Sequence, residues 1–248
     1  MRKSLFLGEK RDAMRILAVS DEESKRFFDY YKPGCLDGFD MILSCGDLHP
    51  EYLEFLVTMA HCPLIYVHGN HDENYTREPE GCICADDAVI TCKGLRIVGL
   101  GGSYRYREGK YMYTERQMER RLFRLGWRLR RAGGFDILLT HAPLRGLNDL
   151  ESLSHRGFSS FRQLLERWEP RYFIHGHVHR NYGVNIPQCC AYGNTTVINA
   201  YEYCVIELED RPTVKKKPRK IKREKTDAAP REAAAIGACS AGNPAGPS

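Results

Sequence analysis

The chain has 248 residues, of which 42% are hydrophobic and 28% are charged, an ordinary balance for a globular protein in water. This length suffices for one α/β domain with a buried core or for two small domains. No apolar run approaches the roughly 18 residues that span a bilayer. The apolar stretch Leu5–Leu7 is too short for the hydrophobic core of a secretory signal. We therefore expect a cytoplasmic protein with no membrane span.

The formal net charge of +5 is concentrated at the C-terminal end of the chain. Residues 213–248 carry nine Lys or Arg and three Asp or Glu, a net of +6, which leaves −1 for the rest. Because the stretch is basic and then rich in Ala, Gly, Pro and Ser, it predicts a disordered tail. The tail either keeps the protein in solution or contacts nucleic acid or a membrane surface. We expect a domain over residues 14–212 and an N-terminal extension over residues 1–13.

Short aliphatic runs recur along this domain, and each is soon followed by Gly, Asp, Asn, Ser or His. Such runs are typical of buried β-strands. Helical periodicity is clearest from Thr114 to Arg131, where Thr114 and Gln117 match a capping box. Alternating strands and helices predict an α/β fold, and two consecutive strands near the end predict a mixed sheet. The other expected helices are 22–31, 50–59 and 159–168, and the expected strands are 16–19, 41–43, 64–67, 97–98, 137–139, 172–174, 195–200 and 203–208.

Polar residues follow five of these expected strands within four positions. Ligands in open α/β sheets bind at the carboxyl ends of strands, so these side chains are expected to converge. Oxygen and nitrogen donors of this kind suit Mn²⁺, Fe, Zn²⁺ or Co²⁺. The residues are Asp21, Asp47, Asn70, His141 and His177, with His179 two positions after His177 and able to face the same cavity.

Each of these residues has an ordinary structural explanation when taken alone. An Asp after a strand is usually a turn or cap residue, Gly46-Asp47 is a turn signal, and Asn70 after Gly69 suits a left-handed turn. A lone His is more often structural than a ligand. The set is informative because five such coincidences occur in a fixed order.

That order resembles the calcineurin-like metallophosphoesterases, whose pattern is D-x-H, G-D, G-N-H-[ED], a single His and G-H-x-H. The resemblance spans residues 14–208 and is closest to small bacterial phosphoesterases and phosphodiesterases. It implies a four-layer α/β/β/α sandwich with mixed sheets. The matching residues here are Asp21-Glu22-Glu23, Gly46-Asp47, Gly69-Asn70-His71-Asp72, His141 and Gly176-His177-Val178-His179.

The resemblance also implies a role for each residue. Asp47 would bridge two divalent metal ions, with Mn²⁺ the first choice and Fe, Zn²⁺ or Co²⁺ as alternatives. Asp21 and His179, with position 23, would hold the first ion. His71, oriented by Asp72, would stabilise the transferring phosphoryl group or assist the leaving group. The second ion would be held by Asn70, His141 and His177. Two metals roughly 3.5–4 Å apart would share a hydroxide that attacks phosphorus in line.

Position 23 departs from the family pattern, because it is Glu where the family usually has His. Glu23 either binds the first metal through its carboxylate, which would favour Mn²⁺ or Fe²⁺, or forms a capping box with Ser20 for a helix over 22–31. In the second case the first metal loses a ligand.

Two other segments are candidates for substrate contact. Residues 99–106 follow a strand but lack the third glycine of a dinucleotide fingerprint. Arg105 in this segment is a candidate phosphate contact, because guanidinium suits phosphate geometry; the alternative is a tight turn with surface aromatics. The segment 155–158 is a weaker candidate for lining the same cleft.

The leading function is therefore metal-dependent hydrolysis of a phosphomonoester or phosphodiester, with a phosphorylated small molecule or nucleotide as substrate. One alternative is a nuclease, motivated by the basic tail and the Arg-rich helix 114–131. The other is a non-catalytic scaffold with this fold, for which Glu23 is the only support. The sequence leaves the oligomeric state open.

Overall fold

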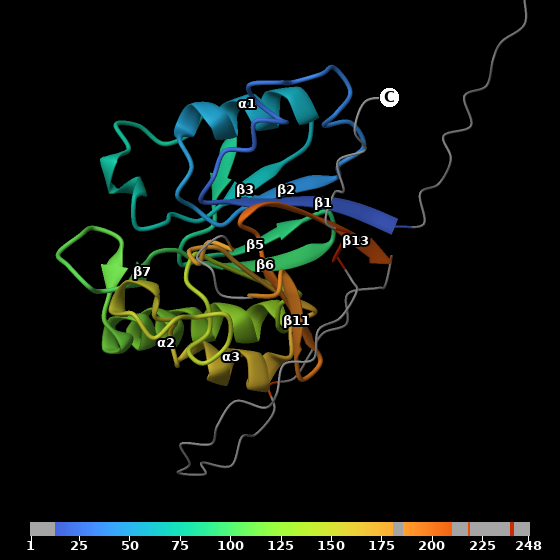
Figure 1. The fold of residues 1–248 in the computed structure, drawn as a ribbon. Coiled ribbons are helices and arrows are strands. Elements are labelled where there is room, and N and C mark those ends of the chain that lie inside the picture. Colours follow the sequence, from blue (N-terminus) through green and yellow to red (C-terminus); the bar gives the residue numbers. More distant parts are fainter. Residues whose placement is uncertain (1–12, 181–185, 210–217, 219–238, 241–248) are drawn as a thin grey trace, which may run out of the picture.

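The computed structural model describes residues 13–180, 186–209, 218 and 239–240. Within these residues the strands form two six-stranded sheets and one two-stranded sheet (Figure 1). The first sheet has the order β14-β13-β1-β2-β3-β4, and the second β11-β12-β10-β9-β6-β5. The strands of the first are β1 (Ala13–Ser20), β2 (Met41–Ser44), β3 (Leu64–Tyr66), β4 (Cys82–Cys84), β13 (Glu202–Glu209) and β14 (Cys239–Ser240). Those of the second are β5 (Val89–Cys92), β6 (Leu95–Leu100), β9 (Ile137–Thr140), β10 (Tyr172–His175), β11 (Cys189–Tyr192) and β12 (Thr195–Asn199), and β7 (Ser103–Tyr104) pairs with β8 (Met112–Tyr113).

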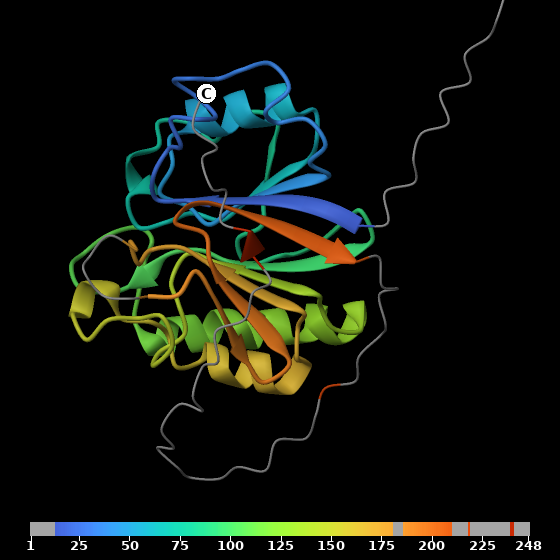
Figure 2. The ribbon, with the colours of Figure 1, turned by 45° about the vertical axis from the view of Figure 1, so that its right-hand side comes forward.

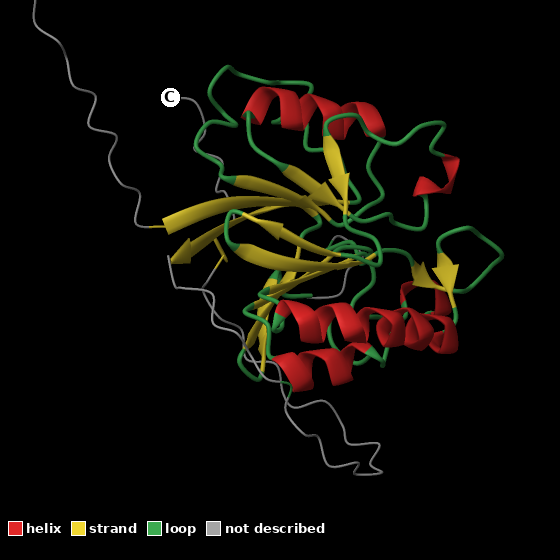
Figure 3. Cartoon of the chain, turned by 180° about the vertical axis from the view of Figure 1, so that it is seen from behind, coloured by secondary structure: helices red, strands yellow, loops and turns green. Residues whose placement is uncertain are grey.

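The two large sheets face each other, and helices cover their outer faces. Helix α1 (Pro50–Ala60) lies on the first sheet, while α2 (Glu115–Ala132) and α3 (Phe161–Trp168) lie on the second. Figures 2 and 3 show the same four layers from other directions, with strands sandwiched between helices. The predicted α/β/β/α sandwich with mixed sheets is confirmed.

The core has three parts because each sheet is buried on both faces. Ile16, Ile65 and Ile137 belong to the cluster that fills the space between the sheets. A second cluster lies under α2 and α3, and a third under α1. Double burial explains why the strands read as unbroken apolar runs rather than alternating patterns. Each fully buried aliphatic side chain contributes about 1.5–3 kcal/mol.

Parallel pairing brings the chemically active strand ends together. In the first sheet β1, β2 and β3 are parallel, with Ile16 opposite Met41. In the second, β6, β9, β10 and β12 are parallel. Backbone hydrogen bonds then join loops that follow different strands, from Asp21 N–H to the Gly46 carbonyl (3.1 Å) and from Gly176 N–H to the His141 carbonyl (3.0 Å).

Most of the predicted elements are confirmed, and one helix is wrong. Helix α2 begins after Thr114, whose side chain accepts from the Gln117 N–H in a capping box. The helix predicted over 22–31 is replaced by turns. Its aromatic residues point to different partners, since Phe27 packs against Tyr203 while Phe28 packs against Phe55. These tertiary contacts outweigh the local helical preference.

The last two predicted strands are present but belong to different sheets. β12 pairs with β10 in the second sheet, whereas β13 runs antiparallel to β1 in the first. The predicted extension 1–13 lies outside the described residues except for Ala13, where β1 begins. The predicted tail 213–248 is described only at 218 and 239–240, and residues 239–240 pair with β13.

None of the helices in the described part of the chain combines the length and the apolar character that a bilayer crossing requires.

Candidate metal centre

Three of the predicted ligand residues have strained backbones. Asp21, Asp47 and His177 have φ angles of 65°, 58° and 69°, in the left-handed region that residues other than glycine seldom occupy. Each lies in the loop that follows a strand, one to three residues after the strand ends. Such strain persists only where the surrounding structure enforces it, and it gathers at functional sites.

Two glycines allow these loops to approach closely. A Cβ on Gly69 would overlap Asp47 Oδ1 and lie 2.5 Å from Asp47 Cγ. A Cβ on Gly176 would overlap Ser20 Oγ and lie 2.5 Å from Asp21 Oδ2. The glycines in the G-N-H and G-H-x-H blocks are therefore required by the packing of the carboxylates against neighbouring backbone.

Asp21 has a buried oxygen that suits a cation. Its side chain is 1% exposed, and Oδ2 accepts a hydrogen bond from the His177 N–H at 2.8 Å. Oδ1 is buried without a hydrogen-bond partner, and His179 Nε2 lies 3.7 Å from it. Burial, together with the nearby Asp47 carboxylate, raises the pKa of Asp21. A bound metal would supply the missing partner and offset the desolvation of this carboxylate.

Asp47, Asn70 and His141 form the centre of the site. His141 Nε2 lies 3.0 Å from Asn70 Oδ1 and 3.3 Å from Asp47 Oδ2. Its other nitrogen, Nδ1, is 2.8 Å from the Cys45 carbonyl oxygen and donates to it, because a carbonyl can only accept. A metal-binding imidazole is commonly oriented in this way by its second nitrogen. Although burial opposes ionisation, His141 and the His71 N–H lower the pKa of Asp47 to about 2.

His177 completes this cluster. Its Nε2 donates to the Ser154 carbonyl at 2.6 Å, which leaves Nδ1 to accept a metal. Burial, reinforced by the nearby His141, lowers the pKa of His177 well below its ordinary value, so the ring is neutral as a ligand must be. Ligand atoms of Asp47, His141 and His177 all lie within 4.8 Å of one another.

His71 and Asp72 have different roles from each other. His71 is exposed, and its backbone N–H donates to Asp47 Oδ1 at 2.7 Å. Asp72 is buried and accepts from the backbone N–H groups of Gly69 (2.7 Å) and Asp47 (3.1 Å). Its described hydrogen bonds therefore join two loops, and orientation of the His71 ring by Asp72 stays a prediction.

The contacts described for the Glu23 and Arg105 side chains go to residues outside the predicted metal centre. The Glu23 carboxylate is 2.8 Å from His49 Nδ1, and without a helix over 22–31 the capping-box alternative is wrong. The Arg105 guanidinium lies 3.4 Å from Gln117 Oε1 and 3.6 Å from Glu108. Metal binding by Glu23 and phosphate binding by Arg105 stay predictions.

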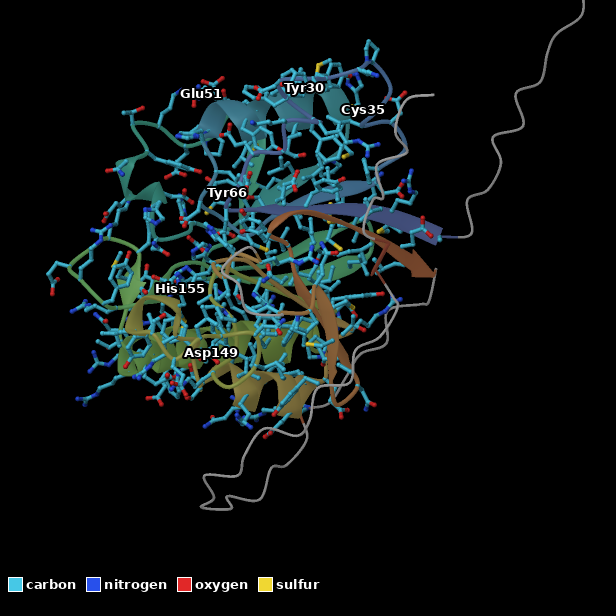
Figure 4. All side chains as sticks on the ribbon, viewed as in Figure 1. Tyr30, Cys35, Glu51, Tyr66, Asp149 and His155 are labelled. Atoms are coloured by element: carbon cyan, nitrogen blue, oxygen red, sulfur yellow. The ribbon has the colours of Figure 1, made fainter. Side chains whose placement is uncertain are left out.

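All of the remaining ligand candidates except the buried His141 line one open cavity of about 270 Å³. Two of its residues were not singled out as site residues from the sequence: Tyr106, which is next to Arg105, and Ser154. His155, which also lines the cavity, belongs to the segment 155–158 that was the weaker candidate for this position. Figure 4 labels His155 in the half of the molecule that contains α2. The glycine-rich segment before Tyr106 was the available signal, but it did not show which side chain faces the cavity. The full lining is Asp21, Asp47, Asn70, His71, Tyr106, Ser154, His155, His177 and His179.

Comparison with known proteins agrees with this site. The profile of the calcineurin-like phosphoesterase family matches residues 14–181, which is more than half of the chain. The protein belongs to this family. It is therefore related to enzymes that hydrolyse phosphoesters with bound metal, and the donor set described above fits divalent metals.

Curated relatives match at lower identity. A UPF0046 protein of Caenorhabditis elegans is 28% identical over 188 residues, covering 65% of this chain and 62% of the relative. The human metallophosphoesterase domain-containing protein 1 is 28% identical over 147 residues, covering 55% of this chain and 40% of the relative. The chain thus spans about two fifths to three fifths of the length of these relatives.

Solved structures agree in fold. One superposes with a TM-score of 0.56 at 15% identity, covering 79% of this chain and 95% of the other. A Thermus thermophilus protein superposes with a TM-score of 0.53 at 17% identity, covering 78% and 94%. At these identities the likeness shows the architecture alone.

The substitution Asp21→Asn is expected to weaken metal binding while stabilising the metal-free protein. The raised pKa of Asp21 means that its ionised form destabilises the metal-free fold at neutral pH. Asn keeps an oxygen for the His177 N–H and tolerates a left-handed φ. A gain of about 1 kcal/mol would raise the melting temperature by about 2–4 °C. This gain should shrink as pH falls and Asp21 takes up a proton.

Thermal melting in a chelator and metal analysis test this expectation together. Asp29→Asn, at an exposed position, is the control that should change neither quantity. A lower metal-free melting temperature for Asp21→Asn would show that burial of this carboxylate is not a destabilising feature.

Proposed function

We propose that this protein hydrolyses phosphate esters at a centre of two divalent metal ions, with Mn²⁺ as the first choice. The observation that carries the proposal is the convergence of carboxylates and imidazoles on one open cavity, where Asp21 Oδ1 is buried without a partner. Asp47 would bridge the two ions. The proposed ligands are Asp21 and His179 on one side, and Asn70, His141 and His177 on the other.

Metal ions bound here would lower the pKa of a coordinated water and neutralise charge on the phosphoryl oxygens. The protein's own groups prepare the site for this chemistry. The Cys45 and Ser154 carbonyls fix the tautomers of His141 and His177, and Asp72 fixes the two loops that carry Asp47 and Asn70. Preorganised donors of this kind need little rearrangement during the reaction.

His71 is the candidate residue for direct contact with substrate. It is exposed, it lines the cavity, and its backbone is tied to Asp47. An imidazole there can donate a hydrogen bond to a phosphoryl oxygen or a proton to the departing oxygen. The cavity volume of about 270 Å³ is near the lower end of ligand pockets, which favours a phosphoryl group with a small or only partly enclosed leaving group.

The decisive assay uses p-nitrophenyl phosphate and bis(p-nitrophenyl) phosphate with the full chain, supplied in turn with Mn²⁺, Co²⁺ and Zn²⁺. Turnover of either ester that disappears with chelator and returns with metal supports the proposal. The ratio of the two activities distinguishes a monoesterase from a diesterase. Absence of turnover of both esters, with no metal retained by the protein, would favour a non-catalytic scaffold.

The substitution His71→Ala is expected to lower kcat about 10²-fold, with a smaller effect on KM and unchanged metal content. A positioned acid or hydrogen-bond donor contributes about 10²–10⁴-fold to rate, and the His71 side chain is not among the proposed ligands. His61→Asn is the control, because His61 is exposed, does not line the cavity described here, and has a left-handed φ of 50° that Asn tolerates. Equal kcat for His71→Ala and wild type would remove His71 from the reaction.

A further inference from the structure

A second cluster of metal-binding side chains lies outside the cavity. Ligand atoms of His68, Cys84 and Asp86 lie within 4.8 Å of one another. Glu78 joins them, because its Oε2 is 2.9 Å from His68 Nε2. None of the four residues lines the cavity of the catalytic site. His68 and Glu78 lie in the segment between β3 and β4. Cys84 is the last residue of β4, and Asp86 lies between β4 and β5.

His68 has the surroundings of a metal-binding histidine. It is 4% exposed, and its Nδ1 lies 2.7 Å from Asp86 Oδ2. The other Asp86 oxygen accepts from the Gly101 N–H at 2.7 Å, which fixes the carboxylate. A carboxylate on one imidazole nitrogen orients the ring and increases the basicity of the other nitrogen. His68 Nε2 therefore faces Glu78 in a fixed direction.

Aromatic rings hold the imidazole in place. Tyr111 stacks on His68 with ring centroids 4.4 Å apart and an interplanar angle of 11°, and Tyr66 meets it edge-on at 5.3 Å. The Tyr66 hydroxyl also donates to Glu78 Oε2 at 2.6 Å. Tyr66 is labelled in Figure 4 and marks the position of the cluster at the end of β3.

We propose that this cluster is a separate mononuclear zinc site, bound by His68 Nε2, the Cys84 thiolate and the Glu78 carboxylate. Nitrogen, sulfur and carboxylate oxygen are the donors that Zn²⁺ takes in proteins. The thiolate distinguishes this site from the oxygen and nitrogen donors of the catalytic site, which suit Mn²⁺. Cys84 is exposed, so the ion enters from solvent and water fills the fourth position. Binding releases the thiol proton and any proton on His68 Nε2.

Zinc at this position would support the catalytic site through the backbone. The His68 carbonyl accepts from the Gly102 N–H at 2.6 Å, and Asn70 follows two residues later. A metal that joins His68 to β4 restrains the segment that carries Asn70. We therefore expect zinc to raise the melting temperature of the wild-type protein more than that of Cys84→Ser.

Cobalt titration of the metal-free full chain tests the proposal, because a thiolate ligand gives Co²⁺ an intense near-ultraviolet charge-transfer band that oxygen and nitrogen ligands do not give. We expect this band in wild type, its loss in Cys84→Ser, and the loss of one bound metal ion per chain. Cys82→Ser is the matched control on the same strand, since the Cys82 thiol donates to the Glu80 carbonyl. It should keep both the band and the ion.

Alkylation gives a second measurement that needs no variant. Peptide mapping after iodoacetamide treatment should show that Zn²⁺ slows modification of Cys84 but not of Cys82. A band that persists in Cys84→Ser, a wild-type titration without a band, or unprotected Cys84 in saturating Zn²⁺ would each overturn the zinc site. None of these readouts depends on phosphoesterase activity, so the zinc site and the proposed function are tested separately.

Discussion

The substitution Asp47→Asn is expected to lower the turnover of a phosphate ester by about 10³-fold, through the loss of several kcal/mol of metal-based stabilisation. The Asp47 carboxylate lies 3.3 Å from His141 through Oδ2 and accepts from the His71 N–H through Oδ1. It is the anionic group that we propose to bridge the two metal ions. Asn has nearly the same size and tolerates the observed φ of 58°, so the fold should be retained.

The measurements are kcat for the p-nitrophenyl esters, metal content and thermal melting. Asp29→Asn removes a charge of the same kind at an exposed position and should leave all three unchanged. Full turnover by Asp47→Asn with its metal intact would contradict a dinuclear mechanism. Loss of turnover together with a large fall in melting temperature would instead assign Asp47 a structural role.

The fold and the centre of the site could be predicted because their signals are local. Strands buried on both faces appear as short aliphatic runs, and the parallel pairing of β1 with β2 and of β9 with β10 follows the expected α/β pattern. The G-D and G-N-H blocks pack so closely that one position must be glycine, since Gly69 has no room for a Cβ beside Asp47. Such steric requirements limit residue choice in a way that a single sequence displays.

The parts that could not be predicted depend on tertiary contacts. Nothing local shows that β13 crosses to the first sheet to pair with β1 while β12 stays in the second. The apolar residues of the segment 22–31 have helical spacing, yet Phe27 and Phe28 pack against aromatic rings in distant elements. Likewise the loop before β8 turns Tyr106 rather than Arg105 toward the cavity, a choice that the residue types alone leave open.

The substitution Gly69→Ala is expected to remove metal binding and to destabilise the protein, although it adds only a methyl group. The new Cβ would overlap Asp47 Oδ1 and lie 2.6 Å from the Asp47 backbone nitrogen. Asp47 cannot easily move away, because Asp72 holds its N–H and the His71 N–H holds Oδ1. Overpacking of this kind costs about 1–3 kcal/mol, which for a domain of this size lowers the melting temperature by several degrees at about 2–4 °C per kcal/mol.

Gly126→Ala is a control for which the expected change in stability has the opposite sign. A Cβ at Gly126 meets nothing within 4 Å, and the residue lies inside α2, where Ala is favoured over Gly by up to about 1 kcal/mol. The same chemical change should therefore stabilise the protein at Gly126 and leave its metal content unchanged. The contrary result is that Gly69→Ala binds metal and melts like wild type. In that case the loops that carry Gly69 and Asp47 would have to separate without loss of stability. The strained placement of Asp47 would then be a consequence of local turn geometry and not a requirement of the metal centre.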